Sequence, residues 1–397
     1  MISDSTIKGG RPPYPPPRSA RTSQGGDAEQ GADDAGERLA TSTSEASLRR
    51  SVERSAQIDE QIKADPSAFR MLTGDRPTGN LHLGHYFGSL ANRVALQDAG
   101  VETLIVIADY QVITDRDATG PLRQRVYSLL ADYLAVGIDP AKTTILTHSA
   151  VPALNQLMLP FLSLVSDSEL YRNPTVKSEA EAAGDRPLSG LLLTYPVHQA
   201  ADILFCKANL VPVGKDQLPH LEQTRVIARR FDERYGRAEP DRPVFPQAEA
   251  LLSDAAYVLG LDGQKMSKSR GNTIEIGMDA DTTAALIKKA VTDSDRHITY
   301  DPANRPEVSN LVMIAALCQG RDPREVADEV GDGGGGGLKK VVTASVNDFF
   351  APIRARRLEL VADPAYLESV LHDGNARANA IADATLDEVR TAMGMVY

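Results

Sequence analysis

The sequence predicts an α/β protein, with a Rossmann-like, doubly wound parallel sheet followed by a C-terminal helical domain. Short apolar runs typical of buried strands alternate with stretches whose apolar residues recur every three or four positions. This alternation indicates crossover helices, and therefore parallel strands. After Asp279 the alternation stops, and the remaining pattern is almost wholly helical.

The elements follow from these patterns in chain order. We expect strands over the apolar runs Phe69–Thr73, Leu104–Ala108, Thr144–Leu146 and Leu210–Val213. We expect helices from about Leu83, over Pro121–Val136, around Gln199–Phe205 and over Gln217–Tyr235. The glycine run Gly333–Gly337 is expected to interrupt the helical region as a flexible loop.

The N-terminal residues, 1 to about 60, are rich in Ser, Pro, Gly, Ala and charge, with almost no large apolar side chains. Such a segment cannot bury enough surface to offset its chain entropy. The predicted organisation is a disordered extension over 1–60, a Rossmann-like domain over 66–275 and a helical domain over 276–397.

The composition is that of a globular protein, with 42% hydrophobic and 24% charged residues among 397. A net charge of -11 excludes a generally basic nucleic-acid binder, although a local basic surface remains possible. No apolar run has transmembrane length, so no membrane partner is expected. Two cysteines, Cys206 and Cys318, are too few for a disulfide framework or a cysteine-rich zinc site. We therefore expect a cytoplasmic protein with no metal site of its own.

The first motif is His82-Leu83-Gly84-His85, at the predicted turn from the first strand to the first helix. Ligands bind at such turns in open α/β sheets, because free helix amides and strand carboxyl ends meet there. Two imidazoles three residues apart can donate hydrogen bonds to one phosphate. Gly84 leaves room for a nucleotide to approach the backbone.

The second motif, Lys265-Met266-Ser267-Lys268-Ser269, is far more specific than the first. Leu261-Asp262-Gly263 before it and Arg270-Gly271-Asn272 after it indicate a mobile loop. Two lysines on such a loop can reach the β- and γ-phosphates of ATP and stabilise the charge on leaving pyrophosphate.

Together the two motifs, 183 positions apart, resemble the signatures of class I aminoacyl-tRNA synthetases. The resemblance implies that an amino-acid carboxylate attacks the α-phosphate of ATP, and that the aminoacyl group then passes to the 3' end of tRNA. Mg²⁺ would be carried by the triphosphate. Catalytic roles are implied for His82, His85, Lys265 and Lys268. An ATP site is implied for Arg76, Pro77, Thr78, Gly84, His85, Gly214, Lys215, Asp216, Val258, Lys265, Met266, Ser267, Lys268 and Ser269.

The segment between the motifs contains the residues that would bind the amino acid. Tyr195, Gln199 and Asp202 step by four and three residues, which places them on one face of a helix. A buried carboxylate there needs a donor, and an indole N–H or a phenol O–H would serve. The segment resembles the amino-acid helix of the subclass that holds the tryptophanyl and tyrosyl enzymes.

Further stretches resemble bacterial tryptophanyl-tRNA synthetases, and the resemblance extends from about Phe69 to Met393. They are Val211–Gln217, Ala290–Ser294 and Tyr300-Asp301. The resemblance implies L-tryptophan, ATP and tRNA(Trp) as partners, a homodimer, and anticodon reading by the helical domain. Asp202 would accept the indole N–H. The other amino-acid-binding residues implied are Tyr195, Gln199, Gln217 and Gln111.

Several positions depart from the usual bacterial pattern. Gln111 stands where histidine is usual, and His198 and Gln199 replace an apolar-Met pair. Lys215 replaces an acidic residue, and Arg76 stands where glutamine is common. These changes resemble a divergent second bacterial form of the enzyme.

The alternatives that remain open are a tyrosyl-tRNA synthetase, a paralogue that binds without charging tRNA, and an adenylyltransferase acting on a small molecule. The Tyr-x-x-x-Gln-x-x-Asp pattern also occurs in tyrosine-specific relatives. The intact histidines and lysines argue against a non-catalytic paralogue, and the lysine motif argues against the adenylyltransferase. The chain contains no tryptophan. One hypothesis is that an enzyme free of tryptophan can be made when tryptophan is scarce. The equal alternative is drift in a protein of low aromatic content.

Overall fold

Five parallel strands form one sheet in the spatial order β3-β2-β1-β4-β5. The computed structural model describes residues 51–114, 121–183, 188–214, 217–236, 243–252, 258–267 and 270–397. The strands are β1 (Arg70–Asp75), β2 (Glu102–Ile107), β3 (Thr143–Thr147), β4 (Leu210–Val213) and β5 (Glu249–Leu252). The order reverses between β1 and β4, so the predicted doubly wound α/β fold is confirmed.

The chain divides into two compact units. The sheet unit contains Gln30–Asn80, Ser89–Ser253 and Arg357–Tyr397, and the motif unit contains Leu81–Gly88 and Asp254–Arg356, so far as these segments are described. The predicted boundary at residue 275 differs from this division. The difference arises because Leu81–Gly88 and the lysine segment group with the motif unit, whereas Arg357–Tyr397 group with the sheet unit.

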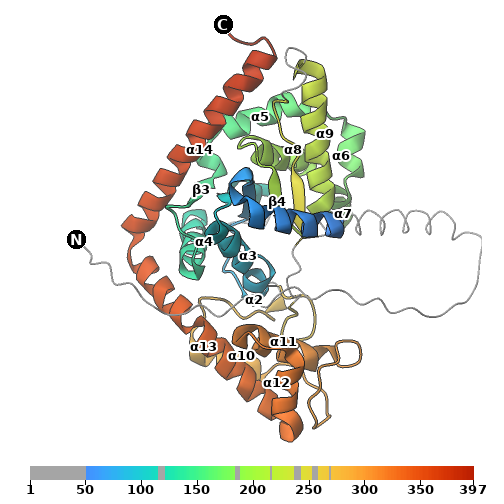
Figure 1. Cartoon of the computed structure of the whole chain (residues 1–397), viewed down its shortest axis with the longest axis vertical. Coiled ribbons are helices and arrows are strands. Elements are labelled where there is room, and N and C mark those ends of the chain that lie inside the picture. Colours follow the sequence, from blue (N-terminus) through green and yellow to red (C-terminus); the bar gives the residue numbers. More distant parts are fainter. Residues whose placement is uncertain are drawn as a thin grey trace, which may run out of the picture. The chain divides into compact units, whose positions relative to one another are not determined.

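Helices of the sheet unit surround the strands. They are α3 (Ala91–Ala99), α4 (Leu122–Val136), α5 (Pro152–Leu162), α6 (Asp167–Arg172), α7 (Pro174–Ala183), α8 (Gly190–Leu204), α9 (Leu218–Tyr235) and α14 (Pro364–Ala392). Helix α14 packs along β3, α4 and α5 (Figure 1). A Cβ atom on Gly374 of this helix would lie 1.8 Å from the Ile145 carbonyl oxygen, so glycine permits the close approach to β3.

Helices of the motif unit lie on either side of the lysine segment in sequence. They are α2 (Leu83–His85), α10 (Ala280–Lys288), α11 (Pro306–Gln319), α12 (Pro323–Val330) and the start of α13 (Gly334–Ala362). Among the residues that the structure describes, no helix combines the length and apolar character that a membrane crossing requires.

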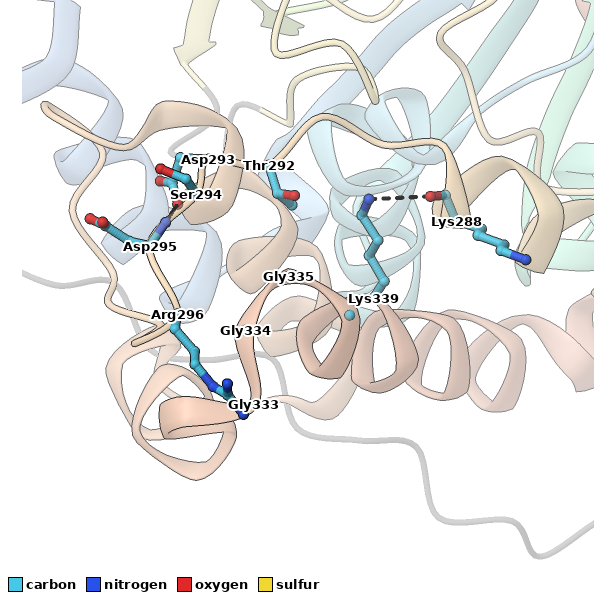
Figure 2. Close-up of a pocket in the computed structure, with 11 residues that line it drawn as sticks. Lys288, Thr292, Asp293, Ser294, Asp295, Arg296, Gly333, Gly334, Gly335 and Lys339 are labelled. Atoms are coloured by element: carbon cyan, nitrogen blue, oxygen red, sulfur yellow. Dashed lines mark hydrogen bonds between the residues drawn. The ribbon is translucent and has the colours of Figure 1, made fainter.

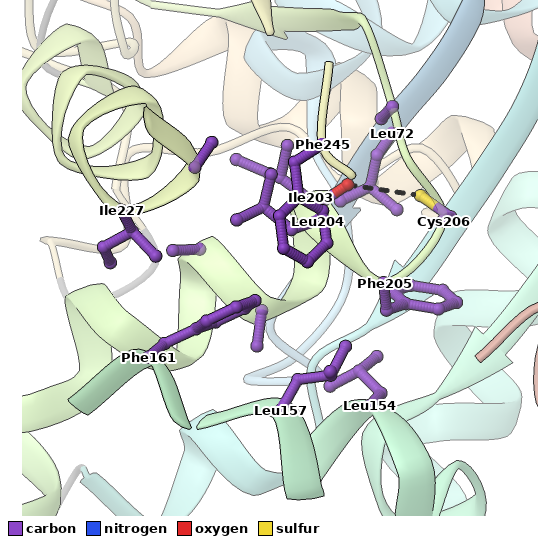
Figure 3. Close-up of a cluster of buried hydrophobic side chains, with 14 of the residues drawn as sticks. Leu72, Leu154, Leu157, Phe161, Ile203, Leu204, Phe205, Cys206, Ile227 and Phe245 are labelled. Carbon is purple, nitrogen blue, oxygen red and sulfur yellow. Dashed lines mark hydrogen bonds between the residues drawn. The ribbon is translucent and has the colours of Figure 1, made fainter. Parts of the chain in front are cut away.

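A large cluster of buried hydrophobic side chains joins the sheet to helices α5, α8 and α9 (Figure 3). Leu72 comes from β1, Leu154 and Phe161 from α5, and Leu204 from α8; each is at most 3% exposed. Each such side chain contributes about 1.5–3 kcal/mol when it is fully buried. This packing fixes α8, the helix that carries the predicted amino-acid-binding residues.

Two sequence predictions are wrong. Residues 51–60, predicted to be disordered, belong to a helix over 51–64. Its buried Ile58 and Ile62 pack with Met71 of β1, so two well-spaced isoleucines outweigh the polar composition. Residues 1–50 of the predicted extension lie outside the described residues.

The predicted flexible loop at Gly333–Gly337 is also wrong, because Gly334 begins α13. A Cβ atom on Gly335 would lie 2.8 Å from Thr292 Oγ1, so glycine meets a packing requirement there. The 29-residue length of α13 compensates for the low helix propensity of its first turn.

Candidate active site

The histidine segment is held by backbone pairing within the motif unit. The Leu83 N–H donates to the Ile274 carbonyl (3.0 Å), and the Ile276 N–H donates to the Leu81 carbonyl (2.9 Å). The His82 backbone N–H donates to His85 Nδ1 (3.2 Å), and the two imidazole centroids are 3.7 Å apart. The two rings predicted to contact phosphate therefore lie side by side.

Gly84 brings the histidine and lysine motifs together. A Cβ atom on Gly84 would lie 3.1 Å from two atoms of the His82 ring and 3.6 Å from Met266 Sδ. An added Cβ atom would therefore crowd the His82 ring, whereas its distance to Met266 Sδ is that of ordinary van der Waals contact. The structure thus places parts of both motifs in contact, although 183 residues separate their first members.

Asn272 ties the lysine segment to the turn before it. Its side-chain amide donates to Asp262 Oδ1 (2.7 Å) and to the Lys265 carbonyl (3.1 Å), and its Oδ1 accepts from the Ser267 N–H (2.8 Å). The hydrogen bond from Asn272 lowers the pKa of Asp262. The mobility predicted for this segment stays a prediction; in its described part, buried Asn272 hydrogen-bonds to the backbone of Lys265 and Ser267.

The other predicted members of the lysine segment and its neighbours have varied exposure. Lys265 is exposed, Met266 is buried, and Val258 is buried upstream. Lys268 and Ser269 lie outside the described residues, as do Lys215 and Asp216.

Arg76, Pro77, Thr78 and Gly214 belong to the sheet unit, where they follow the carboxyl ends of β1 and β4. Met71 pairs with Leu210, and this register puts Asp75 level with Gly214. Strand order reverses at β1 and β4, which is where open α/β sheets bind ligands. Pro77 is buried, whereas Arg76 and Thr78 are exposed.

Asp75 anchors the strand end that precedes Arg76. Its carboxylate accepts hydrogen bonds from Arg93 Nη1 and from the Tyr133 hydroxyl, each at 2.6 Å. Arg93 and Tyr133 are almost fully buried. Gly74 is also required, because a Cβ atom there would lie 2.3 Å from the Val106 carbonyl oxygen of β2.

The predicted amino-acid-binding residues on α8 do share one region of the sheet unit. Gln199 Nε2 donates to Gln217 Oε1 (3.4 Å), and the Tyr195 hydroxyl lies 3.2 Å from His220 Nε2. Asp202 is only 3% exposed. Gln111 lies in the 3₁₀ segment η3 (Tyr110–Thr114), which packs against α8.

Sequence reasoning missed the histidine beside Asp202. His148, in the 3₁₀ turn η4 (His148–Ala150) after β3, places Nε2 2.8 Å from Asp202 Oδ1. Neither atom makes a well-aligned hydrogen bond, and the two groups form an ion pair only when His148 is protonated. Burial disfavours the charged form of His148, but the Asp202 and Asp109 carboxylates outweigh burial and raise its pKa.

Two further polar groups line the same region. His198 of α8 lies with its ring centroid 4.6 Å from that of His148, and burial lowers the pKa of His198. Asp109 accepts hydrogen bonds from the Ser149 N–H (3.1 Å) and from the Ser149 hydroxyl. No sequence spacing could predict these pairs, because the residues come from three separate segments.

A separate polar pocket lies in the motif unit (Figure 2). Lys339 Nζ donates to the Lys288 carbonyl (3.2 Å), and Arg296 Nε donates to the Asp332 carbonyl (3.1 Å). The described site residues predicted from sequence do not line it. Its lining residues are Lys288, Thr292, Asp293, Ser294, Asp295, Arg296, Gly333, Gly334, Gly335, Gly336 and Lys339.

Comparisons with known proteins give a consistent result. Residues 64–351 match the model of the family described as tRNA synthetases class I (W and Y). The tryptophan–tRNA ligase of Treponema pallidum is 43% identical over 335 residues, which are 82% of this chain and 97% of that protein. The Lactococcus lactis tryptophan–tRNA ligase is 41% identical over 341 residues, 82% of this chain and 98% of that protein.

A solved structure agrees with these relatives. Tryptophanyl-tRNA synthetase from Campylobacter jejuni, complexed with ADP and tryptophan, superposes with a TM-score of 0.71 at 32% identity. The match covers 82% of this chain and 99% of that one. With both signature motifs in contact and the sheet order of a nucleotide-binding fold, the chain belongs to the class I tRNA synthetases of the tryptophan and tyrosine type.

Proposed function

We infer that the protein is a tryptophan–tRNA ligase, which activates L-tryptophan with ATP and transfers it to tRNA(Trp). The observation that carries this inference is the buried carboxylate of Asp202 on α8. A carboxylate that is 3% exposed needs donors, and the indole N–H of tryptophan is a donor of the required kind. Relatives named as tryptophan–tRNA ligases, similar over nearly their whole length, support the same substrate.

The first chemical step forms tryptophanyl-adenylate. A carboxylate oxygen of tryptophan attacks the α-phosphorus of ATP, and the bond to the bridging oxygen of pyrophosphate breaks. His82 and His85 contact the phosphates, while Lys265 and Lys268 stabilise the charge that develops on pyrophosphate. Mg²⁺ bound to the triphosphate would offset part of its charge. No enzyme nucleophile takes part.

The second step transfers the aminoacyl group to the 3' end of tRNA, with release of AMP. Tyr195 and Gln217 hold the tryptophan ammonium group, and the hydrogen bond from Gln199 orients the Gln217 amide. Gln111 completes this set. The resemblance to the family implies that ATP is contacted by Arg76, Thr78, Gly84, Gly214 and the lysine segment.

The remaining proposals concern the assembly. The predicted helical domain, 276–397, reads the anticodon, and the enzyme acts as a homodimer in the cytoplasm. Cys206 and Cys318 are buried free thiols, which fits a reducing compartment. Burial raises the pKa of each thiol to about 12, so both remain protonated and unreactive at neutral pH.

The test is amino-acid-dependent exchange of labelled pyrophosphate into ATP, run in parallel with tryptophan and with tyrosine. We expect exchange with tryptophan and a background rate with tyrosine. Exchange with tyrosine alone would overturn the substrate assignment, and exchange with neither would overturn the activity. Charging of tRNA(Trp) transcripts then tests the second step.

A further inference from the structure

The region around Asp202 contains more ligand-type side chains than indole recognition uses. We propose that His148, His198 and Asp202 bind a divalent transition-metal ion such as Zn²⁺ or Co²⁺, which competes with tryptophan. The competition rests on the proposed function, in which Asp202 accepts the indole N–H. The metal site itself rests on the side chains of the sheet unit.

The three residues converge from two elements. His148 lies in η4, and His198 and Asp202 are four residues apart on α8, so they share one helix face. Each offers a nitrogen or oxygen atom, and these atoms all lie within 4.8 Å of one another. The three residues are 0%, 4% and 3% exposed. Ligand atoms this close and this buried can contact a single ion after small rotations.

The contact between His148 and Asp202 has the spacing of two ligands on one ion. His148 Nε2 and Asp202 Oδ1 are 2.8 Å apart without the alignment of a hydrogen bond, and His148 Nδ1 makes none either. Nitrogen and oxygen atoms bound to one ion at about 2.0–2.2 Å lie roughly 3 Å apart. An ion would therefore satisfy buried polar atoms at little structural cost.

His198 is held in the tautomer that a metal ligand requires. The Asn155 side-chain nitrogen donates to the carbonyls of His148 (2.8 Å) and Val151 (3.0 Å), which fixes the orientation of the amide. The amide oxygen of Asn155, Oδ1, therefore faces His198 Nε2 at 2.8 Å. Nε2 must then carry the proton, so Nδ1 keeps its lone pair. Metal-binding histidines usually donate their other ring N–H to such an oxygen.

The donor set selects the class of ion. Two imidazoles and one carboxylate favour zinc and neighbouring transition metals, whereas Mg²⁺ and Ca²⁺ prefer oxygen ligands alone. Asp202 offsets one of the two positive charges. The negative charge of Asp109 acts on both histidines and offsets part of the second positive charge. Asp109 is not itself a ligand, because both of its carboxylate oxygens accept hydrogen bonds from Ser149.

Metal and tryptophan compete because they need the same carboxylate. An ion on Asp202 Oδ1 removes an acceptor from the indole N–H and places positive charge beside it. We expect Zn²⁺ to raise the KM for tryptophan without changing kcat at saturating tryptophan. The Mg²⁺ that accompanies ATP has no comparable effect.

The experiment uses the full chain and Co²⁺ alone, followed by visible absorption and equilibrium dialysis. Because the chain contains no tryptophan, fluorescence anisotropy of added tryptophan reports its displacement by the metal. The variants are His148→Gln and His198→Leu, with His372→Gln, a histidine whose side chain is 82% exposed, as the matched control. Circular dichroism verifies that each variant folds.

We expect one equivalent of Co²⁺ to be lost in both site variants and kept in the control. Asn155→Ala should weaken that equivalent by about 10- to 100-fold, because it removes the oxygen that orients His198. Tryptophan should displace this equivalent, and Zn²⁺ should lower the anisotropy of bound tryptophan.

Three outcomes would overturn the proposal. Absence of Co²⁺ binding, with tryptophan still bound, rejects the metal site and leaves the proposed function intact. Co²⁺ binding that survives both substitutions places the metal elsewhere. Co²⁺ bound at the three residues without displacement by tryptophan rejects the competition; if tryptophan also fails to bind, the proposed function fails with it.

Discussion

The motif unit and the sheet unit prepare their binding residues in different ways. In the motif unit the histidine and lysine segments are held by backbone pairing and by one asparagine, Asn272, and the charged side chain of Lys265 is exposed. In the sheet unit Asp202, His148 and His198 form a buried network of side chains. The first arrangement suits a charged ligand such as a triphosphate, whereas the second suits a substrate that must be selected by one hydrogen bond.

Substitution of Asp202 should have the largest effect on activity. Asp202→Asn keeps the size of the side chain but removes its charge, leaving buried His148 without its counter-charge. We expect kcat/KM for tryptophan in pyrophosphate exchange to fall by about 10²- to 10³-fold. Asp373→Asn, at an exposed position on α14, is the control and should match the parent enzyme. A change below tenfold at Asp202 would remove it from the tryptophan site.

The counterpart in the motif unit is Lys265. Lys265→Ala removes one charge from the developing pyrophosphate, so kcat should fall by about 10²-fold while the KM for tryptophan stays unchanged. Steady-state exchange kinetics measure both constants. Lys289→Ala, an exposed lysine in the same unit, should leave both constants unchanged. A rise in the KM for tryptophan alone would contradict the division of roles.

Disturbing Asn272, which hydrogen-bonds to the lysine segment, should reduce activity less than the two substitutions above. A Cβ atom at residue 260 would lie 2.2 Å from Asn272 Nδ2, so Gly260→Ala must displace the asparagine. We expect a loss of about 1–3 kcal/mol in the free energy of unfolding, with weaker exchange activity. Thermal denaturation measures the first. Gly336→Ala, with no atom within 4 Å of the added methyl group, should instead be neutral or stabilising. Equal behaviour of the two variants would disprove the packing argument.

A surface ion pair of the sheet unit should matter least. Arg230 and the first turn of α6 lower the pKa of Glu169 from 4.5 to about 2. Because the folded-state pKa is lowered, the stabilisation is present above pH 4.5 and is lost as the pH falls toward 2. The pair is about one-third exposed, so solvent screening limits its contribution to about 1 kcal/mol.

Chemical denaturation of Glu169→Gln and the parent protein tests this pair. The difference in unfolding free energy should be present at pH 7 and should vanish near pH 2. A difference that grows on acidification would mean that the sign of the pKa shift is wrong.

The sequence could predict features that lie in continuous segments, but not contacts between distant segments. Apolar runs marked four of the five strands, because buried parallel strands are continuous and rich in Val, Ile and Leu. Strand β5, Glu-Ala-Leu-Leu, has no β-branched residue and was not predicted. The contiguous histidine and lysine motifs were visible as local patterns. The pairing of His148 with Asp202 was not, because the two residues are 54 positions apart and only the folded chain brings η4 close to α8.

The most direct test of the central claim is tryptophan binding without ATP. The protein has no tryptophan, so the anisotropy of added tryptophan reports binding alone. We predict that anisotropy rises with the parent protein and equally with Lys265→Ala, and that it stays at the free-ligand value with Asp202→Asn. Undiminished binding by Asp202→Asn would contradict the account, because tryptophan recognition would then not depend on the buried carboxylate.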